Sequence, residues 1–427
     1  MKTGKLALFG GSKIIKKPFK KYNTIGKEEL NAVTKVIKKG VLSKYLARWS
    51  DDFEGGPKVK TFEKRWAKYF KVKHAISVNS WTSGLVCAVG SIGIEPGDEI
   101  ILPPWTMSAT AMAILHWNAI PVFADIEKDT YCIDPVSIEK NISEYTKAII
   151  VVDIGGQSAD MNRINKIAKK YNLKVICDTA QAPGSLYFKK FTGTLSDVGG
   201  YSLNYHKHIH TGEGGMLVTN DDNIAKKLKL IRNHAEAVVG DMGFNDLSNM
   251  IGHNFRLGEI ESSIGIEQLK KLDGLIKERQ RIAKRLINGL KDLEGLNMPK
   301  TRQNCSHVYY MFFMTLDLDK IKGAKRDKIF NALVAEGVVG LSLKFANVHL
   351  LPIFQKKQAY GSKGFPWTSK ITKREINYNK GICPIAESLH DKNYIGFQMC
   401  MHEMSNDEID IMISAFKKVW KNLKFLK

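Results

Sequence analysis

A lysine beside a glycine-rich turn is the feature of the sequence that most directly suggests chemistry. Lys207 follows Ser202 by five residues and precedes Gly212-Glu213-Gly214-Gly215. The amine of a lysine fixed at such a turn in an α/β sheet could form a Schiff base with an aldehyde cofactor. The Ser202 hydroxyl could bind a phosphate group of the same cofactor. A surface lysine near a turn gives the same local pattern, so this stretch needs support from others.

A second stretch, residues 174–182, places an acid and an amide three residues apart. It ends a buried apolar run with Asp178 and Gln181. Ligands of open α/β sheets collect at the carboxyl ends of the strands. Pyridoxal phosphate needs a carboxylate against its ring nitrogen, because the protonated ring is the electron sink. Asp178 could supply that charge and Gln181 could bond the phenolic oxygen of the ring, whereas the simpler role for Asp178 is a helix N-cap.

Two further stretches could complete a cofactor site. In residues 77–85 an apolar run is followed by small polar residues and a helical segment, and backbone amides at such a helix N-terminus bind phosphate. The stretch Pro103-Pro104-Trp105-Thr106 puts an aromatic side chain at a strand end. Trp105 could stack on a cofactor ring there, or it could belong to the core.

These side chains require a sheet to position them. Most of the predicted strands are continuously apolar and rich in β-branched residues, as strands buried on both faces are. Helical segments lie between several of them, the clearest being 160–171, and this alternation favours a largely parallel sheet with helices on both faces. The seven predicted strands are His74–Val78, Glu99–Pro103, Pro121–Ile126, Ala148–Asp153, Lys174–Thr179, Asp197–Leu203 and Gly214–Asn220.

The pattern changes after about residue 258. Gly258–Leu290 has apolar residues at helical spacing and predicts a long connecting helix. A strand at Val308–Leu316 and a last helix over 405–421, which starts with a capping-box spacing, predict a second, smaller α/β domain. We therefore predict a large cofactor-binding domain with an N-terminal arm over 1–257, and the connector helix with a small domain over 258–427.

Composition and charge exclude several classes of protein. The chain has 427 residues, of which 44% are hydrophobic and 25% are charged, and this usage excludes a disordered or collagen-like chain. The net charge of +22 permits binding to nucleic acid, but 54 of the 65 basic residues are Lys, whereas nucleic-acid sites favour Arg. A solvated Lys-rich surface is the expected explanation, and a basic nucleic-acid-binding protein is the non-enzymatic alternative.

Neither a membrane span nor a metal site is expected. Residues 100–124 carry no formal charge, but Pro103, Pro104 and Pro121 favour two buried strands and a helix instead. No two of the six cysteines form a C-x-x-C pair, and the N-terminus does not resemble a secretory signal, which indicates a reducing, cytoplasmic setting.

If residues 206–210 were extended, the three alternating histidines of this stretch would share one face and could bind a metal. We prefer the interpretation that these histidines have packing and pocket roles beside Lys207.

Together the four stretches resemble the DegT/StrS-type sugar aminotransferases, which are fold-type I pyridoxal-phosphate enzymes. The resemblance covers nearly the whole chain. Further segments that carry it are Gly56–Glu63, Gly156–Met161, Ile251–Ile260, Gln268–Asp273 and Val348–Pro352.

The resemblance implies a role for each matching residue. Lys207 matches the Schiff-base lysine and Asp178 the partner of the pyridine nitrogen, with Gln181 on the ring oxygen and Trp105 at the stacking aromatic. The implied phosphate contacts are Trp81 through its amide, Thr82, Ser202 and, from a neighbouring subunit, Asn254. His349 is a candidate substrate contact. The resemblance therefore implies a homodimer with shared active sites.

Substrate inference rests on the same resemblance. It implies a keto-sugar, usually nucleotide-linked, with glutamate or glutamine as the amino donor, although relatives also act on cyclitol ketones and on an unactivated sugar. One branch of the family replaces the lysine by His and is a dehydratase, and the presence of Lys207 favours transamination. Cysteine desulfurases share the fold type but need a mobile catalytic Cys, for which the sequence has no loop signature.

Two features depart from the family pattern. Trp81 stands where the family usually has Gly, so we expect the indole to point away from the phosphate, toward a dimer interface. In addition, residues 42–54 are longer than usual before the Gly-Pro-Lys-Val motif. That region frames the substrate pocket in the family, which weakens any inference about the substrate.

Overall fold

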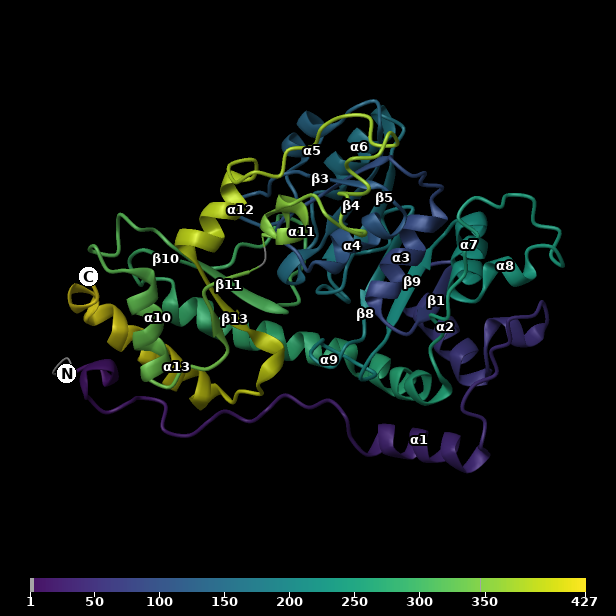
Figure 1. Ribbon diagram of the computed structural model, residues 1–427. Helices are drawn as coiled ribbons and strands as arrows, with labels where there is room; N and C mark the ends of the chain where they lie inside the picture. The colour runs from purple at the N-terminus through teal and green to yellow at the C-terminus, as the bar shows by residue number, and fades with distance from the viewer. Residues whose placement is uncertain (1–3, 346) are drawn as a thin grey trace.

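A seven-stranded sheet forms the centre of the larger part of the molecule, in a computed structural model that describes residues 4–345 and 347–427 (Figure 1). The strand order is β1-β9-β8-β5-β4-β2-β3; all neighbours are parallel except β9, which is antiparallel to both β1 and β8. The predicted, mainly parallel sheet is confirmed, with each strand end within three residues of its expected place. The strands are β1 (His74–Val78), β2 (Glu99–Leu102), β3 (Ile120–Phe123), β4 (Thr146–Val152), β5 (Lys174–Asp178), β8 (Val198–Ser202) and β9 (Gly215–Thr219).

Amphipathic helices connect and cover these strands. In α6 the buried side chains Met161, Ile164 and Ile167 form one stripe, and Asp160 caps the helix by accepting from the Arg163 amide. The predicted helix at 160–171 is therefore present. The segment 100–124 forms β2, α4 and β3, as expected. The helices of this part are α2 (Pro57–Phe70), α3 (Trp81–Ser91), α4 (Ala109–His116), α5 (Pro135–Asn141), α6 (Met161–Lys170), α7 (Asp222–Arg232) and α8 (Ala235–Val238), and a short hairpin is formed by β6 (Leu186–Tyr187) and β7 (Lys190–Phe191).

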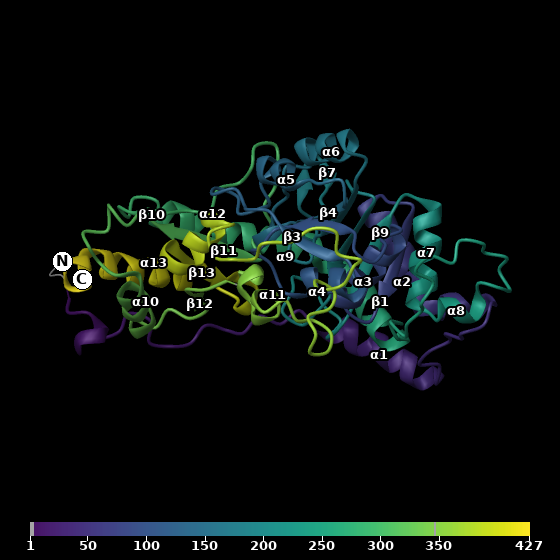
Figure 2. The same ribbon diagram turned by 45° about the horizontal axis from the view of Figure 1, so that its top comes forward.

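The long helix α9 (Glu259–Leu290) runs from the large sheet to a second, four-stranded sheet (Figures 1 and 2). That sheet is antiparallel in the order β10-β11-β13-β12. It packs with two helices and forms a core of its own. Its elements are β10 (Leu296–Asn297), β11 (Met311–Leu316), β12 (Leu341–Ser342), β13 (Tyr394–Gln398), α10 (Arg326–Ala335) and α13 (Asn406–Lys421).

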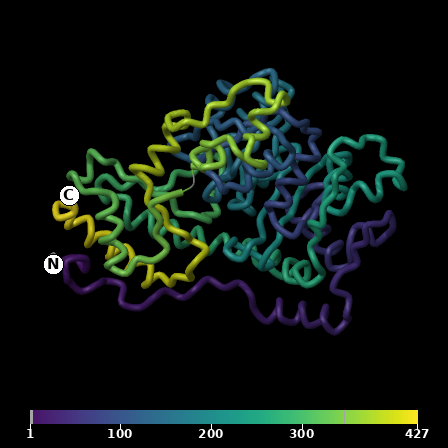
Figure 3. The backbone as a smooth tube through the Cα atoms, viewed as in Figure 1, coloured from purple at the N-terminus to yellow at the C-terminus, as the bar shows by residue number. Residues whose placement is uncertain are grey.

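Two segments cross between the two parts. At the N-terminus, Leu6, Ile15 and Phe19 are buried in the core of the small sheet, and both termini lie at that end of the molecule (Figure 3). The chain then passes along α9 to α1 (Lys27–Lys39), which packs on α9. The strands of the two sheets lie on either side of residue 257 in the sequence, whereas the N-terminal arm packs with both parts. The domain division at residue 257 stays a prediction.

The second crossing segment, residues 348–391, returns to the large sheet. It includes α11 (Pro352–Gln355), a basic loop over 356–383 and α12 (Pro384–Ser388). The Tyr378 hydroxyl donates to the carbonyl oxygen of Pro121 on β3 at 2.7 Å, and Arg374 forms an ion pair with Glu99 on β2 at 2.7 Å. Phe354 is fully buried in the large core.

Across residues 4–345 and 347–427, no helix combines the length and the apolar composition that a membrane span requires.

Candidate active site

Lys207 lies in the turn between β8 and β9 and points into the protein. Its side chain is 7% exposed, and its Nζ lies 4.5 Å from the centre of the Tyr310 ring. Burial lowers the pKa of Lys207 to about 8, and the nearby Asp178 carboxylate opposes that shift. A neutral amine is therefore available close to physiological pH.

Asp178 is the last residue of β5, at the carboxyl edge of the sheet, and its side chain is buried. One carboxylate oxygen, Oδ1, accepts from Trp81 Nε1 at 2.7 Å and from the Ala180 amide at 3.3 Å. The other, Oδ2, accepts from the Thr110 hydroxyl at 2.8 Å. Burial raises the pKa of Asp178, while the Trp81 and Thr110 hydrogen bonds and the charge of Lys207 oppose the rise. Thr110 was not identified from the sequence, because no local pattern links residue 110 to residue 178.

Gln181 is oriented by a backbone amide. Its Oε1 accepts from the Gly155 N–H at 2.8 Å, and within the described chain its Nε2 group has no hydrogen-bond acceptor. The fixed carbonyl end leaves the amide hydrogens of Gln181 available to an oxygen of a bound ligand, which agrees with the expected partner for a ring oxygen.

The N-terminus of α3 lies against the ends of two strands. Ser80 caps the helix by accepting from the Ser83 amide, and Gly215 pairs with Val78 on one side and with Ser202 on the other. A Cβ atom on Gly215 would lie 2.8 Å from the Trp81 amide nitrogen, so only glycine allows this approach. Ser202 and the first amides of α3 are thereby brought together, as a phosphate site requires.

The Trp81 side chain lies inside the protein, not at a surface that a second subunit could cover. The indole is 6% exposed and is directed along the sheet to Asp178. Its ring occupies space that side chains at Gly84 and Gly200 would fill. The expectation that the indole points into a dimer interface is therefore wrong, because Gly84 on the same helix and Gly200 on β8 open a place for it within the chain. Thr82, the next residue, is exposed.

Trp105 lies in the core. The ring has no exposed surface and stacks on Phe313 at 5.6 Å, with Tyr131 and Tyr394 at its other sides. The structure thus places the ring among core aromatics, which was the alternative to stacking on a cofactor. The exposed side chain of this loop is Met107, which is 61% exposed.

His349 is fully buried and has no surface that a substrate could contact. Its Nε2 lies 2.9 Å from Glu387 Oε1, an interaction within the segment 348–391. The proposed substrate contact at His349 is therefore not supported, because its imidazole joins two parts of that segment. The motif Val348–Pro352 predicted the position of the histidine but carried no signal for its partner.

Asn254 is exposed, close to the start of α3. Its Oδ1 accepts a hydrogen bond from Arg256 Nε at 2.7 Å. Its backbone carbonyl oxygen accepts one from the side-chain amide of Asn79 at 3.4 Å. Its contact with a neighbouring subunit stays a prediction.

The histidines beside Lys207 do not share one face. Residues 204–211 form turns rather than an extended strand, so alternation along the sequence does not align the rings. Instead His208 Nε2 contacts the Val308 carbonyl at 2.8 Å, and His206 packs near Tyr310. In the part of the chain that the structure describes, no three His, Cys, Asp or Glu side chains are grouped so that they could hold a metal ion.

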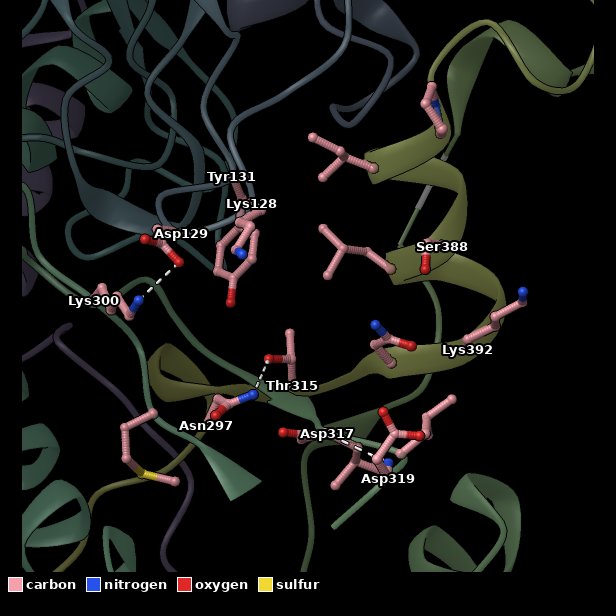
Figure 4. Close-up of a pocket in the computed structure, with 17 residues that line it drawn as sticks. Lys128, Asp129, Tyr131, Asn297, Lys300, Thr315, Asp317, Asp319, Ser388 and Lys392 are labelled. Atoms are coloured by element: carbon pink, nitrogen blue, oxygen red, sulfur yellow. Dashed lines mark hydrogen bonds and ion pairs between the residues drawn. The ribbon is translucent and has the colours of Figure 1, made fainter. Parts of the chain in front are cut away.

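A cavity of about 770 Å³ lies between the two parts of the fold (Figure 4). Lys128, Asp129 and Tyr131 line it from the large part, and Asn297 and Thr315 line it from the small sheet. None of the candidate site residues lines this cavity, so the chemistry is located by the side chains and not by this hollow.

Comparisons with known proteins identify the family of this chain. The sequence model of the DegT/DnrJ/EryC1/StrS aminotransferase family matches residues 23–391. The chain belongs to this family. Members of the DegT/DnrJ/EryC1/StrS family are pyridoxal-phosphate-dependent aminotransferases, and the protein is an enzyme of this class.

Three relatives illustrate the family. The chain is 33% identical over 403 residues to the spore coat polysaccharide biosynthesis protein SpsC of Bacillus subtilis. The matched region covers 93% of this chain and 95% of SpsC. It is 35% identical to GDP-perosamine synthase of Caulobacter vibrioides, over 68% of this chain and 77% of that enzyme. The structure of S. venezuelae DesV in complex with a ketimine intermediate is similar, with a TM-score of 0.76 and 27% identity over 91% of this chain and 93% of DesV.

The residues present fit pyridoxal phosphate. Lys207 offers a buried amine, Asp178 a buried carboxylate, and the close approach at Gly215 a helix N-terminus for the phosphate. When bound, the cofactor supplies an aldehyde that bonds an amine and a ring that withdraws electrons. Asp178 would hold the ring nitrogen and Gln181 the ring oxygen.

Proposed function

We propose that the protein transfers an amino group from glutamate or glutamine to a nucleotide-linked keto-sugar. The reaction would serve the biosynthesis of amino sugars for a cell-surface polysaccharide. The names of SpsC and GDP-perosamine synthase support this class of substrate, since one refers to a coat polysaccharide and the other to a GDP-linked amino sugar. The six free cysteines support a cytoplasmic location.

The observation that carries the proposal is the buried amine of Lys207 close to the Asp178 carboxylate. An amine whose pKa is about 8 can both accept and return a proton near neutral pH. Transamination needs such a group, because a proton must leave one carbon and arrive at another. A histidine at this position would instead favour the dehydratase alternative.

Each residue of the site has a separate task. Lys207 moves the proton, and Asp178 provides the negative charge that opposes a cationic ring nitrogen. Gln181 orients the ring through its amide, which Gly155 holds in place. Ser202 and the amides of Trp81 and Thr82 bind the phosphate. We further propose that Asn254 reaches the phosphate of a neighbouring subunit in a homodimer.

The test combines a trapping step and a substrate panel. Borohydride should fix the cofactor covalently to Lys207, as peptide mass spectrometry would show, and Lys207→Ala should lack the adduct. The purified enzyme is then offered nucleotide-linked keto-sugars, free keto-sugars and keto-cyclitols, each with glutamate or glutamine. Turnover confined to the nucleotide-linked group supports the proposal. Turnover of free sugars or cyclitols alone, or an adduct on another lysine, contradicts it.

A further inference from the structure

The indole of Trp81 makes a hydrogen bond that ties the phosphate end of the site to its ring-nitrogen end. Trp81 is the first residue of α3, whose N-terminus is the phosphate position under the proposed function. Its side chain extends from there to Asp178, where Nε1 donates to Oδ1 at 2.7 Å. One residue thus offers its backbone to the phosphate and its side chain to the carboxylate.

The fold makes specific room for this side chain. A Cβ atom on Gly84, one turn further along α3, would lie 2.6 Å from Trp81 Cε3, and a Cβ atom on Gly200 would overlap the Trp81 ring. Gly200 pairs with Asp178 across β8 and β5, so the indole lies over the strand next to the carboxylate that it contacts. Neither glycine has a positive φ that would require glycine for backbone reasons. Space for the indole is therefore the reason that Gly84 lacks a side chain. It is one of two reasons at Gly200, where a Cβ atom would also lie 2.6 Å from the Met216 carbonyl oxygen.

A buried carboxylate depends strongly on its hydrogen-bond donors. Water cannot stabilise the charge of Asp178, because the residue is 4% exposed. Trp81 and Thr110 donate to different oxygens and so fix the rotation of the carboxylate group as well as its charge. Removal of one donor leaves the charge partly unsatisfied.

We propose that Trp81 is a positioning residue, whose indole N–H orients the Asp178 carboxylate and stabilises its charged form for the ring nitrogen of the cofactor. The role in the reaction rests on the proposed function, whereas the hydrogen bond and its effect on Asp178 do not.

The test measures the ionisation of Asp178 directly, in the full-length protein without cofactor. Aspartate labelled with ¹³C at the carboxyl carbon gives one NMR signal per residue, and Asp178→Asn identifies the signal of Asp178. Trp81→Phe keeps an aromatic ring but removes the N–H. We expect the pKa of Asp178 to rise by about one to two units in this variant, as the loss of a hydrogen bond to a charged group implies.

Two variants separate the donor from the bulk of the side chain. Trp117 is a matched control, because its buried indole also donates at 2.8 Å, but to the backbone carbonyl of Val86. Trp117→Phe should leave the pKa of Asp178 unchanged. Trp81→His keeps a ring N–H at a similar distance from the backbone but loses the second ring. Its imidazole, neutral or protonated, still donates to Asp178, so the pKa of Asp178 should not rise above its wild-type value. Lys207 and Asp153, the ionisable neighbours of Asp178, are kept in every variant, and only Trp81→His adds a further ionisable group beside it.

The outcomes are distinct. An unchanged pKa in Trp81→Phe, or a fall caused by water entering the space, overturns the proposal. An equal rise in Trp81→Phe and Trp81→His also overturns it, because the effect would then follow volume and not the donor. If Trp81→Phe does not fold, Trp81→Leu makes the same comparison. Because no cofactor or substrate is present, failure here leaves the proposed transamination intact, and failure of the substrate panel leaves this result intact.

Discussion

The amine of Lys207 lies over the face of the Tyr310 ring, 4.5 Å from the centre of the ring. The two residues come from different sheets, because Lys207 follows β8 and Tyr310 directly precedes β11. The small sheet therefore covers the lysine that the large sheet positions. This cover contributes to the burial that lowers the pKa of the amine.

The first prediction concerns the pH at which the cofactor attaches. An amine must lose its proton before it attacks an aldehyde. Because the pKa of Lys207 is lowered to about 8, the neutral fraction and the rate of cofactor reloading should rise through that pH and then level off. Stopped-flow absorbance of cofactor-free protein mixed with pyridoxal phosphate measures the rate. Lys207→Ala should lack the absorbance change whose rate rises with pH and then levels off. A rate that still rises around the ordinary lysine pKa of about 10.4 would contradict the expected shift.

The second prediction concerns Asp178→Asn. The amide removes the negative charge and turns an N–H₂ group toward the donors Trp81 or Thr110. The half-reaction with the amino donor should slow at least about tenfold, or about 1.4 kcal/mol of barrier, while cofactor still binds through the phosphate contacts. Asp125→Asn is the control, since Asp125 is also a buried acid but accepts from the Ile385 and Ala386 amides. A near-wild-type half-reaction in Asp178→Asn would refute the role.

The third prediction concerns a shared site. Mixing inactive Lys207→Ala with a severely impaired Asn254→Ala should restore activity if Asn254 completes the partner's site. Random exchange gives about half heterodimers, each with one intact site, so activity should approach about a quarter of wild type. Labelled chains confirm that exchange occurs. Activity that stays at the parental level after exchange, or an active monomer in light scattering, is incompatible with the prediction.

The fourth prediction concerns the space beside the indole. Gly200→Ala places a methyl group where the Trp81 ring lies, and overpacking of this kind should lower the free energy of unfolding by about 1–3 kcal/mol. Gly274→Ala, on the exposed face of α9 with no atom within 4 Å, should instead raise it by up to about 1 kcal/mol. Urea denaturation compares the two. The loss of unfolding free energy caused by Gly200→Ala should be smaller in a Trp81→Phe background. A loss of the same size there would show that a neighbour other than Trp81 causes the strain.

The elements of the large sheet were predictable because each strand carries its own signal. Strands buried on both faces are apolar throughout, so β4 and β5 are visible in the sequence alone. Lys207, Asp178 and Gln181 were singled out for a related reason, since each lies at or just after the carboxyl end of a strand; their roles stay predictions. The order of the strands depends on pairings between distant segments, and no local pattern encodes it.

The corrected side chains share one physical cause. Trp105 and His349 were assigned to the site from their position in motifs, but the depth of a side chain is decided by partners elsewhere, here Phe313 and Glu387. Trp81 could not be placed because Gly200, more than a hundred residues away, provides its space. Long-range packing, unlike strand periodicity, leaves no local trace in a single sequence.

The return of residues 348–391 to the large sheet has a consequence for the order of folding during synthesis. All seven strands of that sheet have been made once β9 is complete, yet Phe354 and Tyr378, which pack on its β3 edge, emerge much later. Leu6 must likewise wait for the small sheet that buries it. Apolar surface at the β3 edge and at the N-terminal arm is therefore exposed until translation is nearly finished, and we expect a fragment ending at residue 257 to aggregate rather than fold.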